Sequence, residues 1–164
     1  MKVTKMIIRE AKRTDIDVLV NLLRSSFRGV AEKFGVTEKN TPKFLAFCTN
    51  ERIEKDLEKD LTYYILEEDG LPCGCVALER AETNVCYLMR LAVLPEHRGK
   101  GYGKMLVHHI FEKSRTYGAS RVEIAMISKD RKLKKWYKKL GFVQKGTKKY
   151  DHLPFVVAFM YREL

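Results

Sequence analysis

The sequence predicts one α/β or α+β domain with a mixed sheet, spanning residues 1–164. A chain of 164 residues with 45% apolar side chains is long and apolar enough to bury one core. Apolar segments with strand patterning alternate with segments at helical spacing. Their order is strand, helix, helix, three strands, helix, strand, helix and two strands, which favours a mixed sheet covered by helices.

The N-terminal region is predicted to form one strand and two helices. Met6–Arg9 is a short strand, and Thr14 opens a helix in which Asp17 is its capping-box partner. One apolar stripe of that helix consists of Ile16, Leu19, Val20, Leu23 and Phe27. Thr41-Pro42 is a second helix start, with proline in its tolerated first turn. We expect this charged second helical region to be broken near Thr49-Asn50.

Three strands are predicted next. Leu61–Glu67 leads through a turn at Asp69-Gly70 into Cys73–Glu79. A second turn at Ala81–Asn84 precedes Val85–Leu94, which is the longest apolar run of the chain. Such a run is typical of a strand that is buried on both faces.

The C-terminal region alternates helices and strands. A helix from about Gly101 to Tyr117 is followed by a strand at Arg121–Ile127. The next helix, from about Asp130 to Leu140, has apolar residues at i, i+3, i+4 and i+7. A glycine follows each helix and is expected to end it. Phe142–Lys148 and Phe155–Tyr161 are the last two strands.

The segment from Arg98 to Lys104, between a buried strand and a helix, carries the clearest chemical signal. Its glycines let backbone N–H groups approach a ligand, and a helix N-terminus adds unpaired donors, which together favour an anion such as phosphate. A Walker loop is excluded because its first glycine would fall on Arg98 and Met105 follows Lys104. The dinucleotide fingerprint is excluded because its third glycine would fall on Lys104. An ordinary glycine-rich turn is the alternative.

Two motifs resemble the GNAT superfamily of N-acyltransferases. Its signature, Gln/Arg-x-x-Gly-x-Gly/Ala after a long central strand, matches Arg98, Gly101 and Gly103. Its tyrosine just ahead of Gly-Phe matches Tyr137 in the segment Trp136–Phe142, and the order of elements fits from Met6 to Tyr161. The resemblance implies a mostly antiparallel sheet of six to seven strands, splayed in the middle and flanked by about four helices. It also implies acetyl-coenzyme A as co-substrate, and no metal.

By this resemblance, the pantetheine arm pairs with the backbone of the central strand, and the pyrophosphate lies on N–H groups of the glycine-rich loop. Arg98 would help to shape that loop. Coenzyme A carries about −4, its 3′-phosphate alone about −1.5 to −2, which suits a basic loop. The implied cofactor-binding residues are Leu91, Ala92, Val93, Arg98, Gly99, Lys100, Gly101, Tyr102, Gly103 and Lys104.

Tyr137 has two interpretations. It lies on the apolar stripe of its helix, where periodicity alone favours a core residue. The resemblance implies instead that Tyr137 is the general acid that protonates the departing thiolate. A phenol with a pKa near 10 can donate to a thiolate whose pKa is near 8.5. The family often has Asn where Asp130 stands, and Asp130 still suits the helix N-cap.

In the implied reaction an amine attacks the thioester directly and needs a base, often a carboxylate acting through water. Glu79, Glu82 and Glu123 lie on or beside the central strands and are candidates, although each also fits a solvated charge at a strand edge. His152, in the loop between the last two strands, is a further candidate for a base or an acceptor contact, or part of a rigid turn. Cys86 and the pair His108-His109 do not suit a nucleophile or a metal site.

The formal net charge of +11 is concentrated in two segments. Residues 96–104 carry a net +2, and residues 129–149 carry ten basic side chains and one acid. A nucleic-acid-binding module is therefore an alternative, although no nucleic-acid motif accompanies the basic helix. A non-catalytic acyl-coenzyme A sensor is another. Without a signal peptide or spanning segment, and with four cysteines in no framework spacing, we expect a cytoplasmic protein. Its acceptor would be a small-molecule or peptide amine, and a homodimer remains open.

Overall fold

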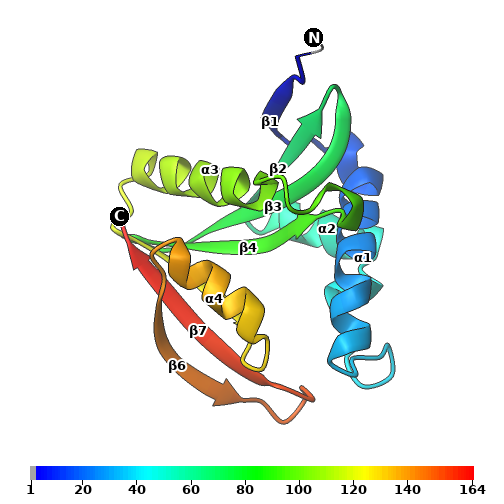
Figure 1. Ribbon diagram of the computed structural model, residues 1–164, viewed down its shortest axis with the longest axis vertical. Helices are drawn as coiled ribbons and strands as arrows, with labels where there is room; N and C mark the ends of the chain where they lie inside the picture. Colours follow the sequence, from blue (N-terminus) through cyan, green and yellow to red (C-terminus); the bar gives the residue numbers. More distant parts are fainter. Residues whose placement is uncertain (1–2) are drawn as a thin grey trace.

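A computed structural model describes residues 3–164 and contains one seven-stranded mixed sheet in the order β1-β2-β3-β4-β5-β7-β6 (Figure 1). All neighbouring strands pair antiparallel except β4 and β5, which are parallel. The predicted order of helices and strands is confirmed. The elements are β1 Met6–Glu10, α1 Ile16–Lys33, α2 Asn50–Glu58, β2 Leu61–Glu68, β3 Leu71–Glu82, β4 Val85–Val93, α3 Tyr102–Thr116, β5 Arg121–Ile127, α4 Arg131–Lys139, β6 Val143–Lys149 and β7 Val156–Glu163.

Both predicted helix starts in the N-terminal region are wrong. A 3₁₀ turn at Arg13–Asp15 precedes α1, so Lys12 and not Thr14 stands at the N-cap, where the carboxylate of Asp15 accepts the N–H of Lys12 at 2.7 Å. Asp17 accepts a hydrogen bond from Asn50 instead of capping. The segment after Thr41 forms only a short 3₁₀ helix, and α2 begins after Thr49, whose hydroxyl accepts the N–H of Arg52. Thr49-Asn50, where we expected the helical region to be broken, is therefore the start of α2.

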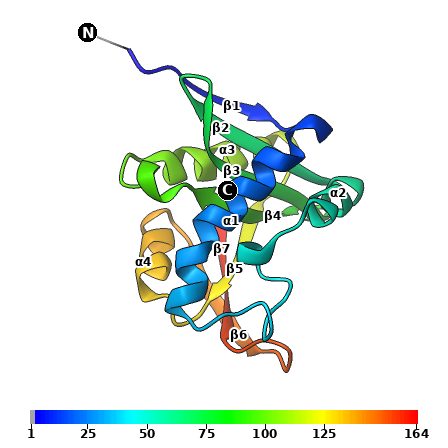
Figure 2. The same ribbon diagram turned by 90° about the vertical axis from the view of Figure 1, so that its right-hand side faces the viewer.

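Two helical layers cover the sheet (Figure 2). Side chains of α3 and α4 pack on one face, with Leu66, Val76 and Leu88 among the strand residues of that core. Side chains of α1 and α2 pack on the other face against the alternate strand residues, including Ile65 and Ala77. The period of two along β2 and β3 thus supplies two cores from the same strands. In strand β4 only Cys86, Leu88 and Ala92 are buried and the other residues are half-buried, so the strand is less buried than its apolar run predicted.

An aromatic cluster joins α1 and the loop after it to the start of β7. The ring of Phe44 lies edge-on to Phe27, with centroids 6.0 Å apart, and edge-on to Phe155 at 6.3 Å. These contacts tie the segment between α1 and α2 to the loop between β6 and β7. Among residues 3–164, no helix combines the length and apolar character needed to cross a bilayer.

The four cysteines are free and buried, and Cys73, Cys75 and Cys86 lie in strands. Cys48 differs, because it lies just before α2 and not in a strand.

Candidate active site

The central feature of the sheet is the separation of β4 from β5. Their parallel pairing is limited to three residue pairs at the start of each strand, the last of which joins Tyr87 to Glu123. Beyond that pair β5 hydrogen-bonds only to β7, while β4 continues along β3. The predicted splay in the middle of the sheet is therefore confirmed. It leaves the β5-facing backbone edge of β4 open over the residues that the resemblance assigns to pantetheine.

A β-bulge lies on β4 beside this opening. Ala77 pairs with Met89, and Cys75 pairs with Ala92, so Arg90 and Leu91 together face the single residue between Cys75 and Ala77. Arg90 has a φ of +56°, a left-handed conformation that is rare for a residue with a side chain. The bulge turns the strand just where it meets the opening.

The glycine-rich loop follows β4 after a short 3₁₀ helix at Pro95–His97 and ends at the N-terminus of α3. Gly99 and Gly101 have φ values of +80° and +83°, and a Cβ at either position would meet no atom within 4 Å. These glycines are therefore required by backbone conformation and not by crowding. The first helical hydrogen bond of α3 is donated by the N–H of Met105 to the carbonyl of Gly101 at 3.1 Å. The preceding N–H groups are left for a ligand or solvent.

The side chain of Arg98 joins the glycine-rich loop to β4 and α1 by hydrogen bonds. Its Nε donates to the carbonyl of Val93 at 3.0 Å, and its Nη2 donates to the carbonyl of Ser26 in α1 at 2.8 Å. The side chain thus connects the end of β4, the loop and α1. This geometry agrees with the loop-shaping role that the resemblance implies for Arg98. Its guanidinium is directed at two carbonyl groups of the protein itself.

Glu68, at the end of β2, is a loop-anchoring residue that the sequence analysis did not identify. Its Oε2 lies 3.1 Å from Nδ1 of His97 and 3.9 Å from Nζ of Lys100. A hydrogen bond with Glu68 raises the pKa of Tyr102 to about 12. One carboxylate therefore engages three side chains of the segment expected to bind phosphate. Lys104 lies in the first turn of α3 and, like Lys100, is exposed.

Helix α4 packs against the start of α3 at Gly103. A Cβ at Gly103 would lie 3.2 Å from Cζ2 of Trp136 and 4.0 Å from Cγ2 of Val93. The second glycine of the motif is therefore explained by crowding, in contrast to Gly101. This close contact brings the Trp136-Tyr137 motif beside the loop and the end of β4.

Tyr137 is buried, with 6% of its surface exposed. Its ring packs against Trp136, with centroids 5.0 Å apart, and against Phe142 at 5.3 Å. Burial raises the pKa of Tyr137, so the phenol stays protonated at neutral pH. A protonated, buried phenol beside the opening fits both the core interpretation and a proton donor. Asp130 caps α4, because its Oδ1 accepts the N–H of Leu133 at 3.1 Å.

The fold places the four candidates for the base in three different regions. Glu79 and Glu123 share one row of the sheet, since both pair with Tyr87 from opposite sides. Glu123 is held by Lys145 at 2.9 Å. Glu82 is exposed and pairs with Val85 at the far end of β4. The seven residues from there to Ala92 span about 23 Å of strand.

His152 is exposed in the loop between β6 and β7, with its ring 5.7 Å from that of Tyr150. The same loop is tied to the α1–α2 segment through Phe155 and Phe44. His152 therefore lies on a different part of the molecule from the row of Glu79 and Glu123.

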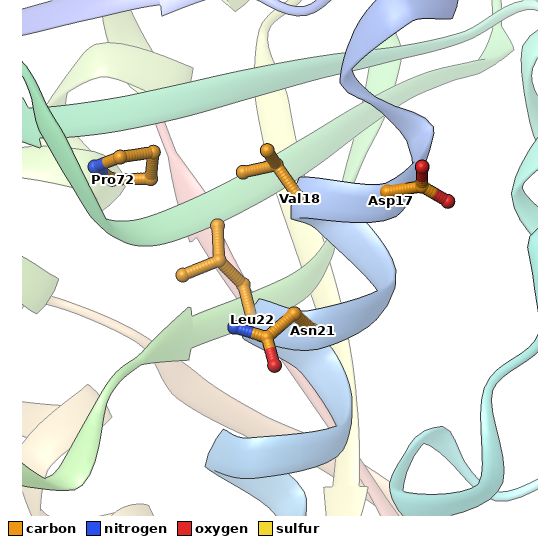
Figure 3. Close-up of a pocket in the computed structure, with 5 residues that line it drawn as sticks. All are labelled: Asp17, Val18, Asn21, Leu22 and Pro72. Atoms are coloured by element: carbon orange, nitrogen blue, oxygen red, sulfur yellow. The ribbon is translucent and has the colours of Figure 1, made fainter.

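Surface hollows do not mark this site. One hollow of about 330 Å³ lies between α1 and β3, where Val18 and Leu22 point toward Pro72 while Asp17 points away (Figure 3). Another of about 330 Å³ lies between α1 and the segment after it, with Arg24 and Arg28 among its lining residues. Neither is lined by a predicted site residue. Within the described residues, no group of three or more His, Cys, Asp or Glu side chains is arranged to hold a metal ion.

The reasoning from sequence also missed a buried polar cluster behind the bulge, formed by Asp56, Tyr63 and Arg90. Arg90 interrupts the apolar run of β4, and Asp56 lies on the inner side of α2 with Ile53. A single charge inside an apolar strand is a usable signal, because buried charges need partners. The identity of the partners depends on contacts between segments far apart in the sequence.

Comparisons with known proteins agree with this geometry. The sequence model of the acetyltransferase (GNAT) family matches residues 17–142. An amino-acid acetyltransferase of Neisseria meningitidis is 30% identical over 148 residues, which cover 90% of this chain and 29% of that protein. The chain thus spans under a third of that relative's length.

Two solved structures are similar over nearly the whole chain. The PaiA N-acetyltransferase of Thermoplasma acidophilum, in complex with coenzyme A, has a TM-score of 0.82 at 17% identity, covering 98% of this chain and 99% of that one. The N-acetylglutamate synthase of Neisseria gonorrhoeae, complexed with coenzyme A and N-acetyl-glutamate, has a TM-score of 0.70 at 26% identity, covering 99% and 36%. With the splayed sheet, the loop and the family match together, the chain belongs to the acetyltransferase (GNAT) family.

Proposed function

We propose that the protein transfers an acetyl group from acetyl-coenzyme A to a primary amine by direct attack in a ternary complex. The observation that carries the proposal is the end of β4–β5 pairing at Tyr87 and Glu123, which leaves an edge of β4 unpaired on the way to a loop with left-handed glycines at a helix N-terminus. An open strand edge can pair with the amide groups of a pantetheine arm. Left-handed glycines and a helix N-terminus suit a pyrophosphate.

The backbone of the bulged strand would receive the thioester carbonyl. N–H groups fixed in a strand stabilise developing negative charge without having to reorganise. Tyr137 would give its proton to the departing sulfur, and burial, which raises the pKa of its phenol, keeps that proton in place at neutral pH. The residues that would hold acetyl-coenzyme A are Leu91 to Val93 and Arg98 to Lys104, with Arg98 acting through the loop.

Glu79 and Glu123 are the stronger candidates for the base, which would act through water. Both lie at the row where β4 and β5 part, and about 13 Å of strand separates Tyr87 from Leu91. Glu82 is the weakest because it lies at the hairpin turn. His152 stays a candidate for contact with the acceptor, since its loop is tied to the α1–α2 segment.

We propose a small amine, first of all an amino acid, as the acceptor. This follows the N. meningitidis relative, which is named an amino-acid acetyltransferase, and the N. gonorrhoeae structure, which contains N-acetyl-glutamate. Both proteins are much longer than this chain, so the amine class needs a direct test.

The test is release of free thiol from acetyl-coenzyme A with a panel of amino acids, polyamines and peptides, and mass spectrometry of the acetylated product. We expect turnover with at least one amine. Binding of coenzyme A without turnover across the panel would favour the sensor, and absence of binding would refute the proposal. A salt-sensitive affinity for nucleic acid, carried by the exposed basic side of α4, would instead support the binding module.

A further inference from the structure

The bulge of β4 is attached to α2 and β2 by a buried polar cluster consisting of Asp56, Tyr63 and Arg90. The hydroxyl of Tyr63 donates to Oδ2 of Asp56 at 2.6 Å. Nε of Arg90 lies 3.4 Å from the same carboxylate oxygen and 3.3 Å from the hydroxyl of Tyr63. Nη2 of Arg90 lies 3.4 Å from Oδ2 as well.

The cluster is shielded from solvent. Tyr63 is 0% exposed and Asp56 is 8% exposed, and the side chain of Arg90 is 14% exposed. A buried charge without its partner is strongly unfavourable, so Asp56 and Arg90 hold each other in place. The short bond from Tyr63 orients the carboxylate toward the guanidinium.

These contacts bear on the backbone because Arg90 is the left-handed residue of the bulge, with φ +56°. Its side chain reaches Asp56 and Tyr63 from that conformation. Rotation to an ordinary strand conformation would redirect the side chain and separate the buried pair. The ion pair therefore favours a backbone conformation that Arg90 would otherwise avoid.

We propose that Asp56 and Tyr63 are positioning residues that act through Arg90 to hold the β4 bulge, and so set the N–H groups on the open edge of Leu91 to Val93, which would receive the thioester carbonyl. This proposal rests on the proposed acetyl transfer. It adds residues on α2 and β2 that touch neither the acyl group nor the acceptor. Cys75 supports the same site, since its thiol lies 3.6 Å from the carbonyl oxygen of Arg90.

The decisive comparison is Arg90→Gly against Arg90→Ala. Both variants lose the guanidinium and leave Asp56 in the same state, so they differ in how easily residue 90 adopts a positive φ. We expect kcat of Arg90→Ala to fall about tenfold below that of Arg90→Gly, because alanine disfavours the left-handed region. The affinity for coenzyme A, measured by calorimetry, should be equal in the two, since residues 98–104 are unchanged. If either variant unfolds, both are made in an Asp56→Asn background, which removes the unpaired charge.

Tyr63→Phe and Tyr64→Phe provide a matched pair on β2. The two tyrosines are neighbours and both are buried, but Tyr64 faces the α3 core and lies 4.5 Å, ring to ring, from His109. We expect Tyr63→Phe to lower kcat while KM for acetyl-coenzyme A is kept, and Tyr64→Phe to leave both unchanged. Equal loss of kcat in the two would mean that the cluster acts only on overall stability.

Crystal structures of Arg90→Ala and Arg90→Gly provide a readout that does not depend on turnover. We expect residue 90 to leave the left-handed region in the alanine variant and to keep it in the glycine variant. If kcat and the backbone are the same in both, the cluster does not position the bulge and the proposal is refuted. Absence of turnover in the wild-type protein would refute the proposed function instead, while the two structures would still decide the role of the cluster.

Discussion

Replacement of Arg98 tests whether this side chain shapes the loop or contacts phosphate. Arg98→Gln removes two hydrogen bonds, to the carbonyls of Val93 and Ser26 at 3.0 Å and 2.8 Å. At about 0.5–1.5 kcal/mol each, and with the lower part of that range chosen because Arg98 is exposed, their loss amounts to about 1–2 kcal/mol. If coenzyme A must supply this free energy to order the loop of Arg98→Gln, the affinity of the variant for coenzyme A falls roughly 5- to 30-fold.

The assay is calorimetric titration of coenzyme A at two salt concentrations, with Lys104→Gln as the matched control. Both variants lose one positive charge, but Lys104 is an exposed side chain in the first turn of α3. A direct phosphate contact is weakened by salt, so the defect of Lys104→Gln should shrink as salt is raised. The defect of Arg98→Gln should persist at high salt, because the bonds it loses join parts of the protein. A defect that disappears with salt would refute the loop-shaping role.

Three further predictions concern Tyr137, the loop glycines and Asp15. Tyr137→Phe should lower kcat roughly 100-fold or more, while the melting temperature changes little. Burial raises the pKa of Tyr137, so the wild-type protein should not lose kcat through deprotonation of this phenol between about pH 8 and 10. Gly101→Ala should reduce stability by about 1–2 kcal/mol through its positive φ, whereas Gly29→Ala, in the open middle of α1, should raise it by about 0.5–1 kcal/mol in denaturant titration. Hydrogen bonds from Arg9 lower the pKa of Asp15 to about 2, below its ordinary 3.8, so this pair stabilises the fold above about pH 4 and loses that effect as pH falls through 2. Asp15→Asn should therefore be about 1–2 kcal/mol less stable at pH 6, with a difference that vanishes toward pH 2 in thermal melts. Equal melting curves at both pH values, an unchanged kcat in Tyr137→Phe, or a stabilised Gly101→Ala would contradict the corresponding argument.

Local signals predicted the C-terminal half of the fold well. Strand β5 was predicted with its bounds as observed, and α4 to within a residue at each end. The reason is that the stripe of α4, its cap at Asp130 and its terminating glycine are all encoded within a dozen residues. The N-terminal half has weaker local signals, since Thr14, Thr41 and Thr49 are all plausible N-caps. Packing of α2 through Ile53 on the sheet selected Thr49.

The candidate site also has parts that local sequence patterns predict and parts that depend on contacts between distant segments. The loop and the Tyr137 motif are each contiguous in sequence, so a local pattern is enough to predict both. The cluster of Asp56, Tyr63 and Arg90 joins residues 34 positions apart, and Glu68 reaches the loop from another strand. Such partners follow from the antiparallel register of β2, β3 and β4, which the sequence alone does not specify.

The glycines of the loop are better evidence for an anion site than its charge. The net +2 of residues 96–104 suggests a basic site for phosphate, but Arg98 donates to two carbonyls and Nζ of Lys100 lies 3.9 Å from Oε2 of Glu68. The positive charges of Arg98 and Lys100 therefore interact largely with other groups of the protein and stabilise the loop. What remains for a pyrophosphate is backbone N–H at a helix N-terminus, in a conformation that Gly99 and Gly101 allow, together with the exposed Lys104. Because backbone donors keep their positions at any salt concentration, a site of this kind holds its ligand through geometry more than through net charge.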